Sequence, residues 1–146
     1  MGDFIRYILT GENDLTLALV EAGLKEVDPE FALQIDQAAT NSADVLHGGE
    51  IYGEVEVNGR EDQVFSEDIE DLREELEDIE DEGKTRVLEL LGAATTMVAF
   101  QLSEEGHEHY RHVDPFWDWL FERYPGVLQI DEEGYYSRDE QLLAMD

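Results

Sequence analysis

The chain has 146 residues, of which 38 are Asp or Glu and only 9 are Lys or Arg, so its formal net charge is −29. It contains no cysteine, which excludes disulfides, thiolate zinc sites, iron–sulfur clusters and cysteine nucleophiles. Hydrophobic residues make up 42% and aromatic residues 10% of the chain, more than disordered acidic chains contain. We therefore expect a folded protein with one domain, 1–146, and a buried core.

The imbalance extends to the choice of cation, because only two of the nine basic residues are lysines, Lys25 and Lys84. This composition resembles that of proteins from extreme halophiles, which are rich in acids, poor in lysine and prefer arginine. At about 1 M salt the Debye length is roughly 3 Å, so repulsion between carboxylates is largely screened. We interpret the charge as an adaptation to molar salt. The alternatives are an acidic surface that mimics nucleic acid and a cation-binding role.

Several locations and partners are disfavoured by the same sequence. The start, Met1–Arg6, lacks the basic region and apolar run of a secretory signal. No stretch approaches the ~18 apolar residues that a membrane helix needs. Nucleic acids and anionic membranes are both negative and would repel this chain. The sequence thus predicts a soluble, cytoplasmic protein that binds neither nucleic acid nor membrane.

Hydrophobic periodicity predicts strands and helices that alternate along the first half of the chain. Aromatic and β-branched residues predict a strand over 3–10. Apolar residues at helical spacing follow, and Gly23 and Pro29 mark the end of that helix. Alternation then predicts a short strand over 31–35 and a hairpin, or one long strand, over 44–58.

Residues 66–82 have the clearest helical pattern. Apolar residues recur there at spacings of three and four and form one narrow stripe: Phe65, Ile69, Leu72, Leu76 and Ile79. The rest of the surface is acidic, with only Arg73 opposing. Acid pairs at i,i+4, such as Glu67–Asp71, should each cost on the order of 0.2–0.5 kcal/mol at low salt. In dilute buffer this helix is therefore expected to depend on its apolar stripe.

In the second half, a short helix is predicted over 84–92 and an apolar strand over 95–102. The polar residues 103–112 are predicted to form a loop. Asp114-Pro115 is the kind of pair that opens a helix, here 116–124. A closing β-hairpin follows.

The first six main elements match the ferredoxin-like order β-α-β-β-α-β, in which two helices cover one face of an antiparallel sheet. We therefore expect an α+β fold, a ferredoxin-like β-α-β-β-α-β sandwich with a C-terminal helix and β-hairpin extension.

A cluster of histidines is the first candidate site. His107, His109 and His112 are three of the four histidines of the chain and lie within six residues of one another. Neutral imidazoles beside carboxylates suit Zn²⁺ or another divalent transition metal. In a helix, His109 would share a face with Glu105 and His112. The alternative is a polar surface loop whose histidines interact with neighbouring carboxylates, in a protein without a cofactor.

The aromatic helix predicted over 116–124 is the second candidate. Its aromatic residues and Leu120 cover about 200° of the helix surface, whereas an ordinary surface helix has an apolar stripe of about 100°. The surplus is either covered by the terminal hairpin or exposed as an interface with a protein partner or a second copy of the chain. The candidate interface residues are Trp117, Phe121 and Tyr124.

No catalytic motif stands out in the sequence. Neither G-x-G-x-x-G nor G-x-x-x-x-G-K-[ST] occurs, and no serine lies in a G-x-S-x-G elbow. The leading hypothesis is a binding or regulatory module that acts through protein contacts, rather than an enzyme. The alternatives are a metal-binding protein or metal-dependent enzyme that uses residues 107–112, and an acidic inhibitor that mimics nucleic acid.

Overall fold

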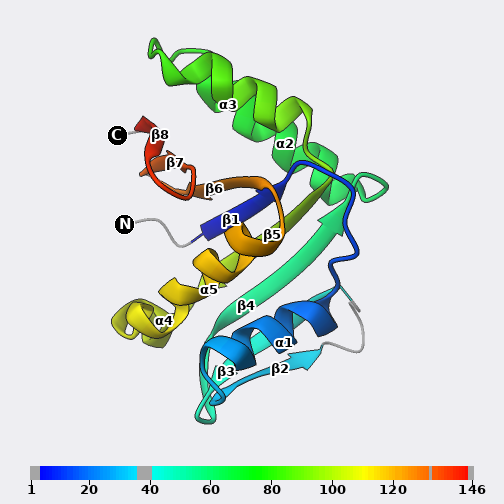
Figure 1. The fold of residues 1–146 in the computed structure, drawn as a ribbon, viewed down its shortest axis with the longest axis vertical. Coiled ribbons are helices and arrows are strands. Elements are labelled where there is room, and N and C mark those ends of the chain that lie inside the picture. The colour runs from blue at the N-terminus through cyan, green and yellow to red at the C-terminus, as the bar shows by residue number, and fades with distance from the viewer. Residues whose placement is uncertain (1–3, 36–40, 132, 145–146) are drawn as a thin grey trace.

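The computed structural model describes residues 4–35, 41–131 and 133–144, which form one antiparallel sheet with helices packed on it (Figure 1). The strands are β1 (Phe4–Leu9), β2 (Phe31–Ile35), β3 (Ser42–His47), β4 (Glu50–Gly59), β5 (Thr96–Leu102), β6 (Gly126–Ile130), β7 (Gly134–Tyr136) and β8 (Gln141–Ala144). The helices are α1 (Leu17–Val27), α2 (Gln63–Leu76), α3 (Gly83–Gly92), α4 (Glu104–Glu108) and α5 (Tyr110–Arg123). The strand order is β2-β3-β4-β5-β1-β6-β7-β8.

Both faces of the sheet are covered, by different helices. Successive side chains of a strand point to opposite faces, and β1 shows this plainly. Its Tyr7 belongs to the core beneath α1 and α5, whereas Ile8 belongs to a second core beneath α2 and α3. Figure 1 shows α2 and α3 together at one end of the molecule, away from α1, α4 and α5. We call the side with α1 and α5 the first face and the side with α2 and α3 the second face.

The mixed α+β class is confirmed, but the ferredoxin-like arrangement is not observed. The sheet has eight strands in the described residues, and helices cover both of its faces instead of one. The difference arises because β1 pairs with β5 on one side and with β6 on the other. The C-terminal strands therefore extend the sheet past β1 instead of packing on it as a separate hairpin.

The α2 prediction is confirmed in its apolar stripe, because Phe65, Leu72 and Leu76 are all buried. The helix ends at Leu76, however, before the run of acids that was predicted to continue it to residue 82. Those acids would have met the negative end of the helix dipole. Ending the helix earlier leaves them in the connection to α3.

The segment predicted as a loop, 103–112, is largely helical. Ser103 caps α4 by accepting a hydrogen bond from the Gly106 N–H at 3.3 Å. Helix α5 begins at Tyr110, so Pro115 lies inside it and not at its first position. A proline there removes one backbone N–H from the helical ladder. Burial of Val113 and Phe116 on either side holds the helix together across this gap.

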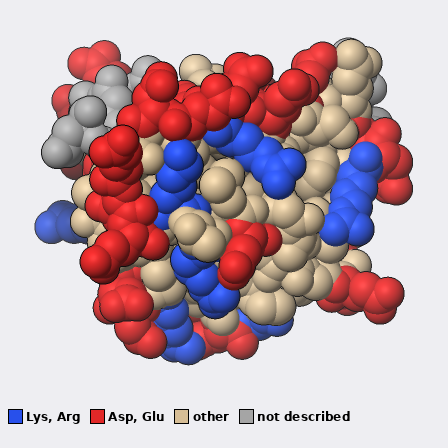
Figure 2. Space-filling view, turned by 90° about the horizontal axis from the view of Figure 1, so that it is seen from above, with Lys and Arg blue, Asp and Glu red and all other residues tan. Residues whose placement is uncertain are grey.

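The surface shows how the net charge is distributed. Figure 2 shows acidic side chains along much of the rim of one face, with Lys and Arg side chains distributed across this face and at its edges. None of the described helices combines the length and the apolar character that crossing a bilayer requires.

Candidate functional site

Helix α5 lies on the first face and carries the predicted interface residues. Trp117 is only 3% exposed and forms part of the core. Phe121 and Tyr124 are half-buried and pack against that core. Phe121, for example, meets Tyr7 of β1 edge to face, with ring centroids 5.0 Å apart. The sheet therefore covers much of the aromatic surface that the sequence left without a partner.

A pocket of about 460 Å³ remains between α5 and the β6–β7 region, and we call it the α5 pocket. Its volume lies in the range of about 300–1,000 Å³ that is typical of ligand sites. Its apolar lining is Leu102, Trp117, Phe121, Leu128, Ile130 and Tyr136. Its polar lining is His107, Tyr110, Asp114, Asp118, Glu133, Ser137 and Arg138.

The α5 pocket is acidic. Asp114 and Asp118 lie one turn apart on α5, and Glu133 adds a third carboxylate from the β6–β7 turn. Partial burial and the charge of Asp118 raise the pKa of Asp114, although a hydrogen bond with Tyr110 acts in the opposite direction. Burial raises the pKa of Tyr110 itself to about 12, so this phenol is neutral near pH 7. The pocket therefore combines aromatic walls with negative charge that its own hydrogen bonds do not neutralise.

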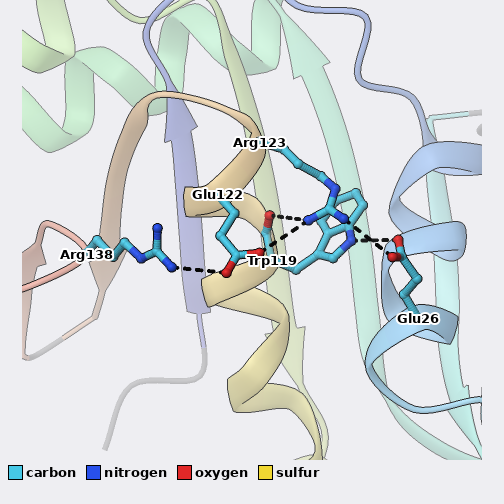
Figure 3. A network of polar contacts seen from close by, with 5 residues as sticks. All are labelled: Glu26, Trp119, Glu122, Arg123 and Arg138. Carbon is cyan, nitrogen blue, oxygen red and sulfur yellow. Dashed lines mark hydrogen bonds and ion pairs between the residues drawn. The ribbon is translucent and has the colours of Figure 1, made fainter.

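The cation on the pocket lining, Arg138, is already engaged. Its Nη2 lies 3.0 Å from Oε1 of Glu122 on α5 (Figure 3). Glu122 also lies 3.6 Å from Arg123, which bonds the Trp119 carbonyl oxygen at 3.3 Å. Arg123 and the Trp119 Nε1–H both reach Glu26 on α1, at 3.4 and 2.9 Å. This network joins α1, α5 and the segment after β7. Within it, the Arg138 guanidinium forms an ion pair with Glu122.

Histidines gather on another surface of α5, beside the β3–β4 hairpin. His47 and His112 stack with ring centroids 4.5 Å apart, and Tyr52 lies parallel to both. The His47 Nε2 is 2.9 Å from Oδ2 of Asp28, and the Tyr52 hydroxyl is 3.1 Å from Nδ1 of His112. The His109 ring is nearly parallel to those of Tyr52 and His112, with ring centroids 5.9 Å from each. The sequence analysis did not identify His47 as a member of this cluster. The one signal for it was its position two residues after Val45, which places both side chains on the same side of a strand.

The predicted metal ligands are divided between two places. His107 lines the α5 pocket, whereas His112 bonds Tyr52. Among the described residues, the group whose ligand atoms all lie within 4.8 Å of one another is Glu105, Glu108 and His109. A divalent-metal site that uses the histidines of 107–112 stays a prediction. The geometry favours Glu105, Glu108 and His109 as ligands over the three histidines.

We expect zinc binding in this region to be lost in His109→Ala and retained in His107→Ala, because only His109 belongs to the carboxylate group. Zinc titration calorimetry on the two variants and the parent protein measures this. Equal losses in both variants would restore the three-histidine set, and a parent protein that binds no zinc would remove the site altogether.

Comparison of this chain with models of protein families, with curated proteins and with solved structures finds no match. A functional inference therefore depends on the geometry of the structure, and around α4 and α5 three features bear on it: the α5 pocket, the stacked histidines and the Glu105–His109 group. Of the three, the α5 pocket has the volume and the mixed apolar and charged lining that enclose a ligand.

Proposed function

We propose that this protein is a salt-adapted binding module that acts through protein contacts, and that its α5 pocket receives a basic side chain of the partner. The observation that carries the proposal is the combination of three carboxylates with aromatic walls in one pocket. Aromatic faces attract cations by about 0.5–2 kcal/mol, depending on how fully the pair is desolvated. Carboxylates at the same site add charge-assisted hydrogen bonds.

The apolar and acidic parts of the lining match the two parts of a basic side chain. Lys and Arg have an apolar stem and a charged head, and they bury the stem while the head meets polar groups. In the α5 pocket, Trp117, Phe121 and Leu128 would contact the stem, and Asp114 and Asp118 would bind the head. A cation here would also favour the ionised form of Asp114, whose pKa is raised in the free protein.

The test measures the binding of two blocked amino acids, N-acetyl-arginine amide and N-acetyl-norleucine amide. Backbone amide chemical shifts of the protein at high KCl report the binding. We expect the arginine derivative to bind in the α5 pocket and Asp118→Asn to weaken it by about fivefold. Asp78→Asn is the matched control, since it removes the same charge outside the pocket.

Two results would contradict the proposal in different ways. Equal affinity for both probes would show that the pocket binds the apolar part of a side chain and does not select for a basic group. Chemical-shift changes outside the pocket, or equal losses of affinity in the two variants, would show that the arginine derivative is attracted only by the net negative charge of the protein.

A metal-binding role is the second candidate. It is favoured by the Glu105, Glu108 and His109 group, in which the His109 and Glu105 side chains keep 44% and 46% exposure to solvent. The zinc titration described above distinguishes it from the first proposal, because neither His109 nor the two glutamates lines the α5 pocket.

A further inference from the structure

A second pocket lies on the second face of the sheet, between α2 and the end of α3, and its lining has a different character. Its volume is about 500 Å³. Its apolar lining is the partly exposed Ile69 above Phe65 and Leu91, which are buried in the second core. Arg60 and Arg73 line the same pocket, so we call it the Arg60–Arg73 pocket.

The placement of these two arginines is informative because positive charge is scarce. The chain has 9 Lys and Arg against 38 Asp and Glu, yet two of the nine line this one pocket. Among the described residues that line it, Glu70 is the one carboxylate. The α5 pocket has the reverse balance, with three carboxylates and an arginine that is already paired.

Arg60 is oriented by the backbone. Its Nε donates a hydrogen bond to the Ala94 carbonyl oxygen at 2.8 Å. This bond uses one edge of the guanidinium and leaves the terminal nitrogens for another acceptor. In the described part of the chain, no carboxylate forms an ion pair with Arg60. The side chain is therefore held in place without being neutralised.

Arg73 lies at the end of α3. A Cβ built on Gly92 would be 3.7 Å from Arg73 Nη2, so the guanidinium extends over the last residue of that helix. A cation is favourable at a helix C-terminus, which accounts for part of this placement. Within the described residues, however, Arg73 makes no hydrogen bond or ion pair, although acids surround it in sequence. All five of its donors are available.

We infer that the Arg60–Arg73 pocket binds a small organic anion through both guanidiniums, with the apolar part of the anion against the partly exposed Ile69. The planar guanidinium matches the geometry of carboxylate and phosphate groups, and it is more weakly hydrated than an ammonium group. The Ser66 hydroxyl also lines the pocket and offers a further donor. The site is independent of the α5 pocket, which lies on the other face of the sheet.

The test follows backbone amide and arginine Nε–H chemical shifts during titration with benzoate and with phenyl phosphate, at constant ionic strength. We expect saturable shifts at Arg60, Arg73 and the neighbouring apolar residues, and about tenfold weaker binding in Arg73→Gln. Arg86→Gln on α3 is the matched control, because it removes the same charge from a residue that does not line the pocket. The relative affinity of the two probes identifies the preferred anionic group.

Acetate and inorganic phosphate, which lack an apolar part, test the other half of the inference. We expect each to bind more weakly than its aromatic counterpart, since it has no apolar part to cover the partly exposed Ile69. The inference is overturned if neither aromatic probe gives saturable shifts in the pocket. It is equally overturned if Arg86→Gln weakens binding as much as Arg73→Gln does, because the anion would then respond only to net charge.

Discussion

The melting temperature of this protein is expected to rise by about 10 °C or more between about 0.1 M and about 3 M KCl. A net charge of −29 on 146 residues makes the folded state repel itself. At about 1 M salt the Debye length of roughly 3 Å removes most of that repulsion. Since 1 kcal/mol shifts the melting temperature of a domain of this size by roughly 2–8 °C, a gain of a few kcal/mol produces the expected rise.

Helix α2 carries closely spaced acids, and we expect it to contribute to this repulsion. Asp71 has Glu67 and Glu75 one turn away on either side. Partial burial raises the pKa values of Asp68 and Glu75, and the charge of Asp71 raises both further. Arg6 acts in the opposite direction on both carboxyls but does not reverse the result. Burial is thus the main reason that ionisation of Asp68 and Glu75 is disfavoured, and the charge of Asp71 adds to it.

Asp71→Asn isolates this contribution, because it removes two repulsive pairs at i,i+4. At about 0.1 M KCl we expect it to stabilise the protein by about 0.4–1 kcal/mol, and at about 3 M KCl by almost nothing. Asp139→Asn removes the same charge from an exposed position outside the helices and serves as the control.

Two outcomes of the salt series would be decisive. A melting temperature that stays flat across the range would contradict adaptation to salt. An equal gain from Asp71→Asn and Asp139→Asn would locate the repulsion in the net charge and not on α2.

Gly23→Ala is expected to destabilise the protein by about 1–3 kcal/mol, although alanine is the better helix former. In an exposed helix the same change would gain about 0.5–1 kcal/mol. Gly23 is buried in α1, and a Cβ there would lie only 2.7–2.8 Å from three atoms of the Trp119 indole. The steric cost therefore exceeds the gain in helix propensity.

The Trp119 ring has little freedom to move away. Its Nε1–H bonds Glu26 at 2.9 Å, its ring stacks on Phe116 at 5.6 Å, and Arg123 lies 4.3 Å above it (Figure 3). Relief of the clash would separate α5 from α1. Those two helices form much of the first face.

Urea unfolding at high KCl measures this effect. Gly11→Ala is the control, since its Cβ would meet nothing closer than Pro125 at 3.6 Å, and we expect a change within about 0.5 kcal/mol. The double variant with Trp119→Leu should recover part of the loss. If Gly23→Ala is neutral or stabilising, the close packing of α1 on α5 is wrong.

The sequence predicted individual elements better than their arrangement. The stripe Phe65, Leu72 and Leu76 identified the buried side of α2, because helical periodicity marks a face directly. Periodicity does not say which strands are neighbours. The pairing of Tyr7 with Leu128 joins segments from opposite ends of the chain, and no local pattern predicts it.

The candidate site was predicted in part for the same reason. The aromatic excess on α5 drew attention to Trp117 and Phe121, which line a pocket, and to Tyr124, which does not; an interface role for them stays a prediction. The other wall comes from β6 and the segment around β7, with Glu133 and Tyr136, and depends on the sheet order. Likewise, His47 joins His112 only because the β3–β4 hairpin lies beside α5.

The central position of β1 has a consequence for how the molecule is made. On the ribosome, β1 emerges first, but Ile5 pairs with Phe100 on one side and with Ile130 on the other. The strands β2, β3 and β4 can form their meander early, because their contacts are local in sequence. The apolar β1 cannot complete its pairing in the sheet until β6 has been synthesised. Closure of the sheet around β1 is therefore expected to be a late, slow step that follows the synthesis of β6.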